Sequence, residues 1–375
     1  MTMRAILIAM ILSVVSIYWQ HLSSVIEGGS TLYALSTPPV PAIFCILLLI
    51  GAAPLLGKVL GKPLSKQELI VIFMFLVLAI PQVTWGVTEI LLPWMTTHVY
   101  FATPQNDLHK ITELLPKWYY PSDPDLIREM YEGSADGSVP WKPWLYPLGM
   151  WTILMTLMFF TGMCLVSMFR KQWADRERLR FPLLLLPISL VEKESPGSHV
   201  PFFRNPLVWI AFVLVFTHHI LNVMNAYNPS VAALKDFYRI GAIFTEEPWT
   251  AYHNVRFFYR PQVLGLAYFV SPDLLFSTWF SFLMQPTSTV IADVFGLRQD
   301  PSFPFSVEQG SGAFLAMLFV LFWVGRGQLA LIARKALTGD PSIDDSDERI
   351  PYRWSFFGAI GGFTAIIIWS HFSGF

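Results

Sequence analysis

The chain has 375 residues, of which 54% are hydrophobic and only 14% are charged, and its formal net charge is −1. Soluble domains usually carry about 25% charged residues, so this composition excludes an ordinary soluble protein and indicates a polytopic membrane protein. The near-neutral charge gives no indication of nucleic acid as a partner or of a polybasic lipid-binding patch. Cys45 and Cys164 both lie in apolar stretches, and we interpret them as small apolar residues, not as a disulfide or a metal site.

Apolar stretches of spanning length recur along the whole chain. A membrane-spanning helix needs about 20 predominantly apolar residues. We therefore predict an all-α class, a polytopic transmembrane helix bundle that forms one integral membrane domain over residues 1–375. Its seven predicted spans are Met3–Gln20, Pro39–Leu60, Glu68–Leu92, Leu145–Arg170, Pro206–Ala226, Ser311–Ala333 and Trp354–His371. Gly358 and Gly362 give the last span a GxxxG spacing, which favours close packing on another helix.

The first apolar stretch also has features of a signal peptide, because Arg4 precedes an apolar run. However, bulky Tyr18, Trp19 and Gln20 stand where a cleavage site of small residues is required. We therefore predict an uncleaved first span.

Basic residues predict the orientation of the chain. They follow the second and fourth predicted spans and lie between the last two, as Lys58, Lys62, Lys66, Arg170, Lys171, Arg176, Arg178, Arg180, Arg334, Lys335, Arg349 and Arg353. Because short cytoplasmic loops carry an excess of Lys and Arg, we predict a cytoplasmic N-terminus and a cytoplasmic or interfacial segment at 171–205. Residues 100–144 and 228–261 are then extracytoplasmic, the first as an aromatic-rich cap.

An eighth apolar stretch, Gln262–Gln285, is interrupted by Ser271, Pro272 and Asp273. Arg204 and Arg334 are both predicted to be cytoplasmic, and two spans already connect them, so this stretch must enter and leave by the same side or cross twice. We predict a broken or re-entrant segment whose second half starts near Pro272. One kinked span that crosses the membrane is the alternative.

The main candidate site lies in the polar second half of Pro206–Ala226. At 100° per residue, His218, Asn222 and Asn225 fall within about 60° of one another on a helix. Polar groups at membrane depth are costly, so this stripe is a candidate substrate or ion site, which we place near the break at Ser271–Asp273. Hydrogen bonds that hold helices together are the alternative explanation.

Four further residues are candidates for substrate binding. Gln82 and Glu89 share a helix face in a span that Pro81, Gly86 or Pro93 can bend. If the helix leaves the membrane after Gly86, Glu89 is instead interfacial. Arg326 lies inside the predicted span edge, where it either reaches the interface, pairs with a carboxylate or binds an anion. Asp273 either caps a half-helix or coordinates an ion.

Several blocks of the sequence carry a resemblance to a known group of proteins. They are RKQWADRERLRFPLLLLPISL (170–190), FTEEPWTAYHNVRFF (244–258), LGLAYFVSPDLLFSTWF (264–280) and DDSDERIPYRWSFFGAIGG (344–362). The chain resembles an uncharacterised bacterial family of large polytopic membrane proteins, known only by domains of unknown function and loosely similar to oligopeptide-transporter-like proteins. The shared segment is matched by Arg170, Trp173, Glu177, Arg178, Leu179, Phe181 and Pro182. The resemblance implies an N-terminal half of such a protein, with a partner half or a second copy, in the bacterial inner membrane.

Catalytic and nucleotide-binding motifs are absent from the sequence: it has no credible P-loop, GxSxG, GxGxxG or HExxH motif. We therefore expect no enzyme, no metal site and no cofactor. The function we predict is a secondary transporter or its permease-like half, with the lipid bilayer and a small molecule or ion as partners. The alternative is a non-catalytic membrane scaffold or accessory subunit of a larger complex.

Overall fold

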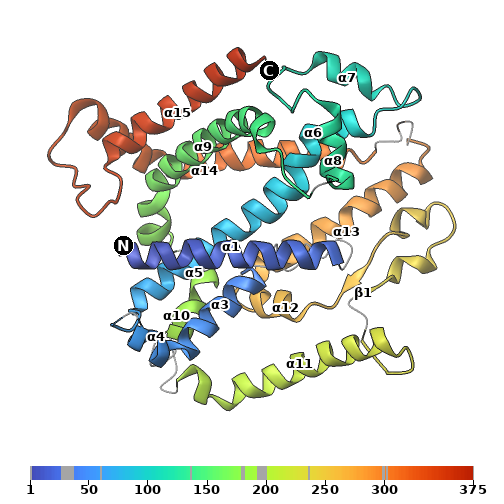
Figure 1. Ribbon diagram of the computed structural model, residues 1–375, viewed down its shortest axis with the longest axis horizontal. Coiled ribbons are helices and arrows are strands. Elements are labelled where there is room, and N and C mark those ends of the chain that lie inside the picture. The colour runs from blue at the N-terminus through green and yellow to red at the C-terminus, as the bar shows by residue number, and fades with distance from the viewer. Residues whose placement is uncertain are drawn as a thin grey trace. The chain divides into compact units, whose positions relative to one another are not determined.

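Helices make up nearly all of the regular structure (Figure 1). The computed structural model describes residues 2–26, 38–59, 61–135, 137–178, 182–191, 201–234, 237–297, 300 and 303–374. In this part of the chain the two strands, β1 and β2, form a two-residue antiparallel pair in which Phe237 lies opposite Phe258. The predicted all-α class is confirmed.

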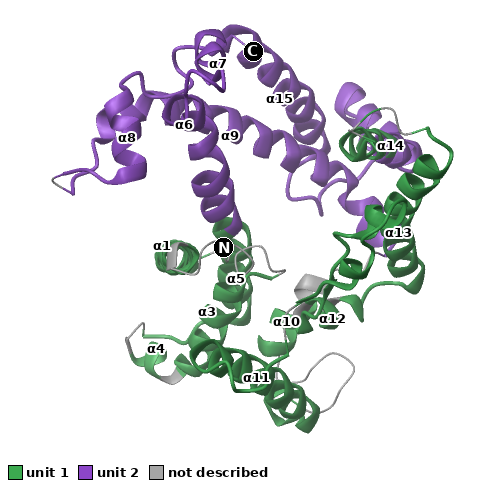
Figure 2. Cartoon of the chain, turned by 90° about the vertical axis from the view of Figure 1, so that its right-hand side faces the viewer, with its two compact units in different colours: residues 1–80, 181–316 green, residues 81–180, 317–375 purple. Residues whose placement is uncertain are grey.

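The chain divides into two units, drawn in separate colours in Figure 2: unit 1 comprises residues 1–80 and 181–316, and unit 2 comprises residues 81–180 and 317–375. Unit 1 contains α1 Met3–Ile26, α3 Val40–Gly51, α4 Ala53–Val59, α5 Lys66–Pro81 except its last residue, α10 Pro182–Val191, η3 Phe202–Arg204, α11 Pro206–Tyr227, β1 Phe237–Tyr238, η4 Ile240–Ile243, η5 Trp249–Tyr252, β2 Phe257–Phe258, α12 Pro261–Ala267, α13 Pro272–Val294 and the start of α14 Ser306–Thr338. Unit 2 contains η1 Gln82–Leu91, α6 Leu92–Tyr100, α7 Leu108–Leu114, α8 Pro124–Glu132, α9 Trp141–Lys171, η2 Gln172–Arg176, the rest of α14 and α15 Tyr352–Ser373.

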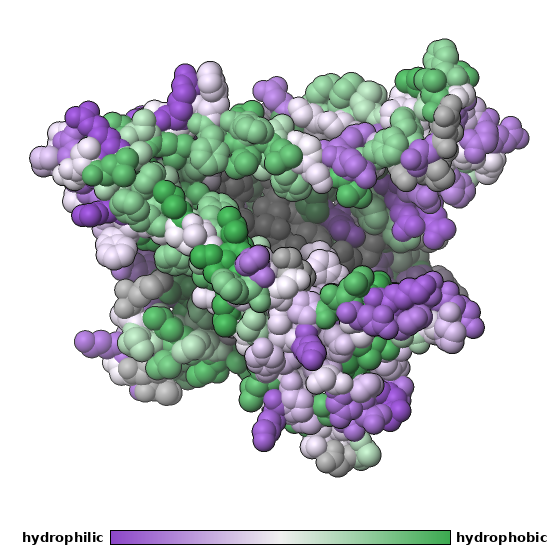
Figure 3. Space-filling model, turned by 90° about the horizontal axis from the view of Figure 1, so that it is seen from above, coloured by the Kyte–Doolittle hydropathy of each residue, from purple (hydrophilic) through white to green (hydrophobic). Residues whose placement is uncertain are grey.

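Six helical runs of the described chain are long and apolar enough to cross a membrane. They are Met3–Ser24, Lys66–Tyr100, Trp141–Arg176, Pro206–Tyr227, Ser306–Thr338 and Tyr352–Ser373. Large hydrophobic side chains on them are exposed, among them Phe216 and Phe363. On the face drawn in Figure 3, hydrophobic residues in green cover broad areas beside hydrophilic patches in purple. The chain is an integral, multi-pass membrane protein.

The predicted span Pro39–Leu60 is wrong as a single helix. The chain forms two shorter helices there, α3 and α4, which Ala52 separates. Pro54 lacks the N–H that would continue the hydrogen-bond ladder, and the carbonyl of Ala52 instead accepts bonds from Leu55 and Leu56 that start α4. With 12 residues, α3 is about 18 Å long, which is less than the thickness of a bilayer core.

The break predicted inside Gln262–Gln285 is confirmed. α12 ends at Ala267, and α13 begins at Pro272 after Ser271, whose extended backbone (φ −65°, ψ 144°) starts the new helix. The predicted end is wrong, because α13 continues through Pro286 to Val294. Whether the segment returns to the side it came from stays a prediction.

The helical run Lys66–Tyr100 does not break, although it contains prolines. It changes its hydrogen bonding instead: directly after Pro81, the ten residues Gln82–Leu91 form a π-helix. The Thr88 hydroxyl follows the same wider spacing and donates to the carbonyl of Val83, five residues earlier, at 3.0 Å. Proline removes one bond of the α-helical ladder, and a π-helical turn is a known way to accommodate such a disruption.

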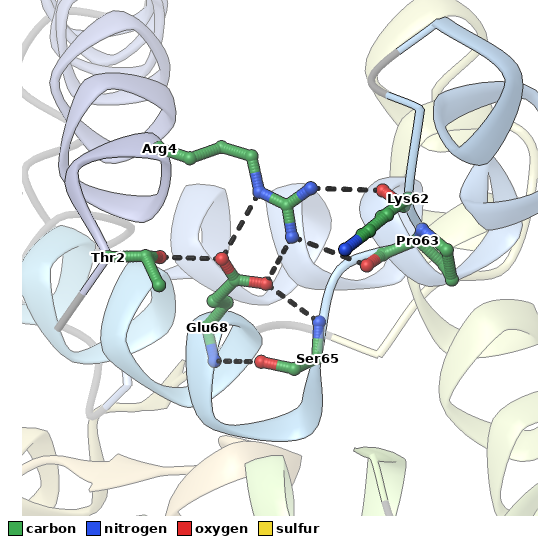
Figure 4. Close-up of polar contacts among 6 residues, drawn as sticks. All are labelled: Thr2, Arg4, Lys62, Pro63, Ser65 and Glu68. Carbon is green, nitrogen blue, oxygen red and sulfur yellow. Dashed lines mark hydrogen bonds and ion pairs between the residues drawn. The ribbon is translucent and has the colours of Figure 1, made fainter.

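An ion pair joins the first helix of unit 1 to the start of α5 (Figure 4). Ser65 and Glu68 form a capping box, because the Ser65 N–H donates to Glu68 Oε2 at 2.9 Å and the Glu68 N–H donates to Ser65 Oγ at 3.3 Å. Arg4 binds the same carboxylate with two nitrogens, at 2.6 and 3.1 Å, and donates to the carbonyls of Lys62 and Pro63. The Glu68 side chain is almost fully buried, so the pair fixes α1 against the entry of α5.

We expect Glu68→Ala to lower the free energy of unfolding by about 2 kcal/mol, because it removes charge-assisted hydrogen bonds from a buried site. Ser65→Ala removes only the helix cap and should cost about 1 kcal/mol. Reversible unfolding of the purified protein in mixed detergent micelles measures both changes. If Ser65→Ala lowers the free energy of unfolding as much as Glu68→Ala does, the ion pair with Arg4 contributes nothing to stability.

Candidate functional site

The polar part of α11 lies in a helix that is well defined from its first residue. Asn205 caps the helix by accepting from the Leu207 N–H at 3.0 Å, and Pro206 occupies the first turn, where a missing N–H has no cost. All residues of α11 are described, and His218 is the only one that is buried, with 8% of its surface exposed. The one residue that this apolar helix buries is therefore ionisable.

His218, Asn222 and Tyr259 form a small cluster in unit 1, which we call the histidine cluster. The amide nitrogen of Asn222 lies 3.3 Å from His218 Nε2, one helical turn away. The Tyr259 ring meets the imidazole edge-on, with centroids 5.6 Å apart and planes at 75°. Sequence reasoning missed Tyr259, because it lies outside the apolar spans and only its place in the aromatic run Phe257–Tyr259 marks it.

Asn225, the third residue of the predicted stripe, has a different role. Its amide donates to the carbonyl of Val231 at 2.6 Å and to that of Pro229 at 3.4 Å. It thus anchors the chain that leaves α11. Helical spacing placed the three side chains on one face, but only His218 and Asn222 contact each other.

Gln82 and Glu89 both lie in the π-helical stretch of unit 2. Gln82 is exposed and Glu89 is half-buried. A π-helix bonds each residue to the fifth along the chain, so one residue turns the helix by less than in an α-helix. The shared face that α-helical spacing predicts for this pair is therefore not formed.

Asp273 and Arg326 are exposed. Asp273 lies in the first turn of α13, where a carboxylate interacts favourably with the helix dipole. His218 contacts Tyr259, which lies before α12, and its proximity to the break stays a prediction. Arg326 donates to the carbonyl of Trp323 and covers the Trp323 ring.

A polar network in unit 2 was not predicted. Arg170, at the end of α9, binds Glu348 through two bonds of 2.6 and 2.9 Å, although 178 positions separate the two residues. Tyr352 donates to the same carboxylate at 3.3 Å and accepts from Gln328 of α14 at 3.1 Å. The network ties α9, α14 and α15 together. Its two charged members lie in two of the four sequence blocks of the resemblance, 170–190 and 344–362, which is the signal that could have found it.

The loop that carries Glu348 is anchored at its start by Asp340. The hydroxyl and the backbone N–H of Ser342 donate to this carboxylate at 2.7 and 2.9 Å, and Arg334 pairs with it at 2.8 Å. These hydrogen bonds, and then the charges of Arg334 and Lys335, lower the pKa of Asp340 below its ordinary value. Asp340 therefore remains ionised and holds the loop to the end of α14.

In the part of the chain that the structure describes, no group of three or more His, Cys, Asp and Glu side chains is placed to hold a metal ion.

Across its full length, residues 1–375, the sequence matches the model of a family described as Family of unknown function (DUF6785). The chain belongs to this family. No curated protein and no solved structure matches it. For this family member, the polar clusters inside the apolar helices are therefore the basis for any functional argument.

Proposed function

We propose that this protein is a secondary transporter, or the permease-like half of one, and that His218 and Asn222 belong to its substrate or ion site. The proposal includes a bacterial inner-membrane location with a cytoplasmic N-terminus. The observation that carries it is the burial of His218 on α11, a helix whose other residues are all exposed or half-buried.

A helix that only supports a bundle is expected to bury small residues at its contacts, or polar side chains that hydrogen-bond to another helix. α11 buries an imidazole and pairs it with an amide of the same helix. Histidine is the side chain whose charge changes most readily near neutral pH, and ionisable groups inside spans commonly mark ion and proton pathways. The histidine cluster therefore has the chemistry to bind a polar solute or to exchange a proton.

The second candidate function is a membrane scaffold or accessory subunit. The network of Arg170, Glu348, Tyr352 and Gln328 favours it, because each of these polar groups is satisfied by a neighbour in the same unit. Static satisfaction of this kind stabilises a bundle and leaves no group free for a solute. A transport measurement separates the two functions.

We expect His218→Gln to reduce solute uptake at least tenfold, whereas His219→Gln should leave it within about twofold of wild type. The adjacent His219 is exposed and makes a matched control of the same chemistry, although its ring meets the His218 ring edge-on with centroids 5.2 Å apart. The assay is accumulation of a defined mixture of amino acids, dipeptides and dicarboxylates in proteoliposomes under an imposed proton or sodium gradient, measured by mass spectrometry.

Two results would contradict this proposal, the first its transport function and the second the role of His218. In one, the wild-type protein accumulates no solute of the mixture under either gradient, which favours the scaffold. In the other, the His218 and His219 variants lose uptake equally, in proportion to folded protein, which makes His218 a structural residue.

A further inference from the structure

Arg326 is a charged residue in a stretch of α14 that is apolar apart from Gln328. Its Nη1 donates to the carbonyl of Trp323 at 2.7 Å, and its Cζ lies 4.4 Å from the centroid of the Trp323 ring. Both contacts lie one turn toward the N-terminal end of the helix. The guanidinium therefore points away from Arg334 and the basic end of α14.

The neighbours of Arg326 show which side of α14 it occupies. Gly325 is buried against Phe169 of α9, where an added Cβ would lie 2.6 Å from the ring, and Gln328 is buried against Tyr352. Arg326 is turned by about 100° from Gly325. It shares its side with Trp323 and Phe319, which are 69% and 72% exposed. It is thus the charged member of an exposed apolar face.

The depth of the guanidinium follows from the helix geometry. Arg326 precedes Arg334 by eight residues, which is about 12 Å of helix, and the guanidinium reaches back to the level of Trp323, about 16 Å from Arg334. Half of a bilayer core is about 15 Å. If Arg334 marks the cytoplasmic edge, the charge lies near the middle of the membrane, far from lipid phosphate groups.

The charge of Arg326 is not neutralised within the described chain, where no carboxylate lies within ion-pair distance of it. A guanidinium has five N–H donors, and the structure engages one of them with the Trp323 carbonyl. Among the acidic residues of the six spanning runs, Glu68 pairs with Arg4, while Asp175 and Glu308 lie near helix ends.

We propose that Arg326 binds the anionic group, a carboxylate or a phosphate, of a small solute. An arginine fork matches both groups through paired hydrogen bonds. Gly327 leaves room beside it, since a Cβ added there would meet no atom within 4 Å. The inference that Arg326 binds an anion rests on these observations alone. The further statement that this anion is the transported substrate rests on the proposed function.

The test uses the full-length protein in nanodiscs of neutral phosphatidylcholine, with succinate and inorganic phosphate as probes. We expect one of these anions to raise the Tm of the wild-type protein and of Arg334→Gln. Arg334 is a matched control on the same helix, already paired with Asp340. Arg326→Gln should weaken the apparent Kd for that anion at least tenfold, and Arg326→Lys, which keeps the charge but not the fork, should weaken it less. Arg326→Lys also keeps the test decisive if Arg326→Gln does not fold.

Three outcomes would overturn the anion site. In the first, neither anion raises the Tm of the wild-type protein, and in the second, an anion raises the Tm of wild type and of Arg326→Gln equally. In the third, the Tm rises only when the nanodisc contains phosphatidylglycerol, which assigns Arg326 to a lipid headgroup. A His218→Gln protein that binds the anion normally but fails in uptake keeps this inference separate from the proposed transport. Conversely, the wild type could bind no anion while Arg326→Gln takes up uncharged solutes normally. That result rules out the anion site and leaves the proposed transporter standing.

Discussion

Arg170→Ala is expected to lower the free energy of unfolding by about 3 kcal/mol, because it leaves the Glu348 carboxylate buried without its cation. Only 1% of the Glu348 side chain is exposed, whereas 43% of the Arg170 side chain is exposed. The two partners therefore differ in what their removal leaves behind. Glu348→Ala leaves a guanidinium that water can still reach, and it should cost only about 1 to 2 kcal/mol.

This asymmetry is the measurable signature of the pair. Reversible unfolding in mixed detergent micelles gives the two single effects, and the double variant should be less destabilised than Arg170→Ala alone. Arg334→Ala is the control: its pair with Asp340 is largely solvated on the arginine side and should be worth less than about 1 kcal/mol. If Arg170→Ala and Arg334→Ala cost the same, Glu348 is not held in a buried ion pair.

Gly362→Val is expected to destabilise unit 2 by about 3 kcal/mol by separating α15 from α9. A Cβ at position 362 would collide with the Thr161 hydroxyl and would lie 3.1 Å from its Cβ and 3.4 Å from its Cα. The hydroxyl cannot move without losing its 2.7 Å bond to the Leu157 carbonyl, and the backbone of α9 cannot move without disturbing the whole interface. Overpacking a close contact of this kind typically costs about 1 to 3 kcal/mol, and valine adds two further methyl groups.

The neighbouring glycine is the control for this prediction. Gly361 has no atom within 4 Å of an added Cβ, so Gly361→Ala should be neutral or stabilise the helix by up to about 1 kcal/mol. Thermal unfolding of both variants in detergent decides between them. A Gly362→Val protein as stable as wild type would rule out the close packing of α15 on α9 at this position.

The GxxxG spacing of Gly358 and Gly362 predicted a close contact between the last span and another helix, and the structure confirms this contact. The partner is α9, with Cys164 beside Gly358 and Thr161 beside Gly362. The partner could not be predicted, because small residues permit close approach to any helix. The start of α13 at Pro272 was predictable for the opposite reason, since proline and its neighbours act on their own backbone.

The candidate site illustrates the same limit. Helical periodicity placed His218, Asn222 and Asn225 on one face, but hydrogen-bond partners divide them into a cluster with Tyr259 and an anchor for the following loop. The i, i+7 spacing of Gln82 and Glu89 assumed an α-helix, and the π-helix after Pro81 changed the geometry on which that spacing depends.

The sequence by itself determined the membrane class and most spans, because apolar length and composition are local properties that need no partner. It also determined helix starts such as Asn205–Pro206, where a capping side chain and a proline act within one turn. Only the tertiary structure decided the pairs Arg4–Glu68 and Arg170–Glu348, which lie 64 and 178 positions apart. Such pairs form only where packing brings two helices together and excludes water. The local sequence does not show which helices will pack against each other.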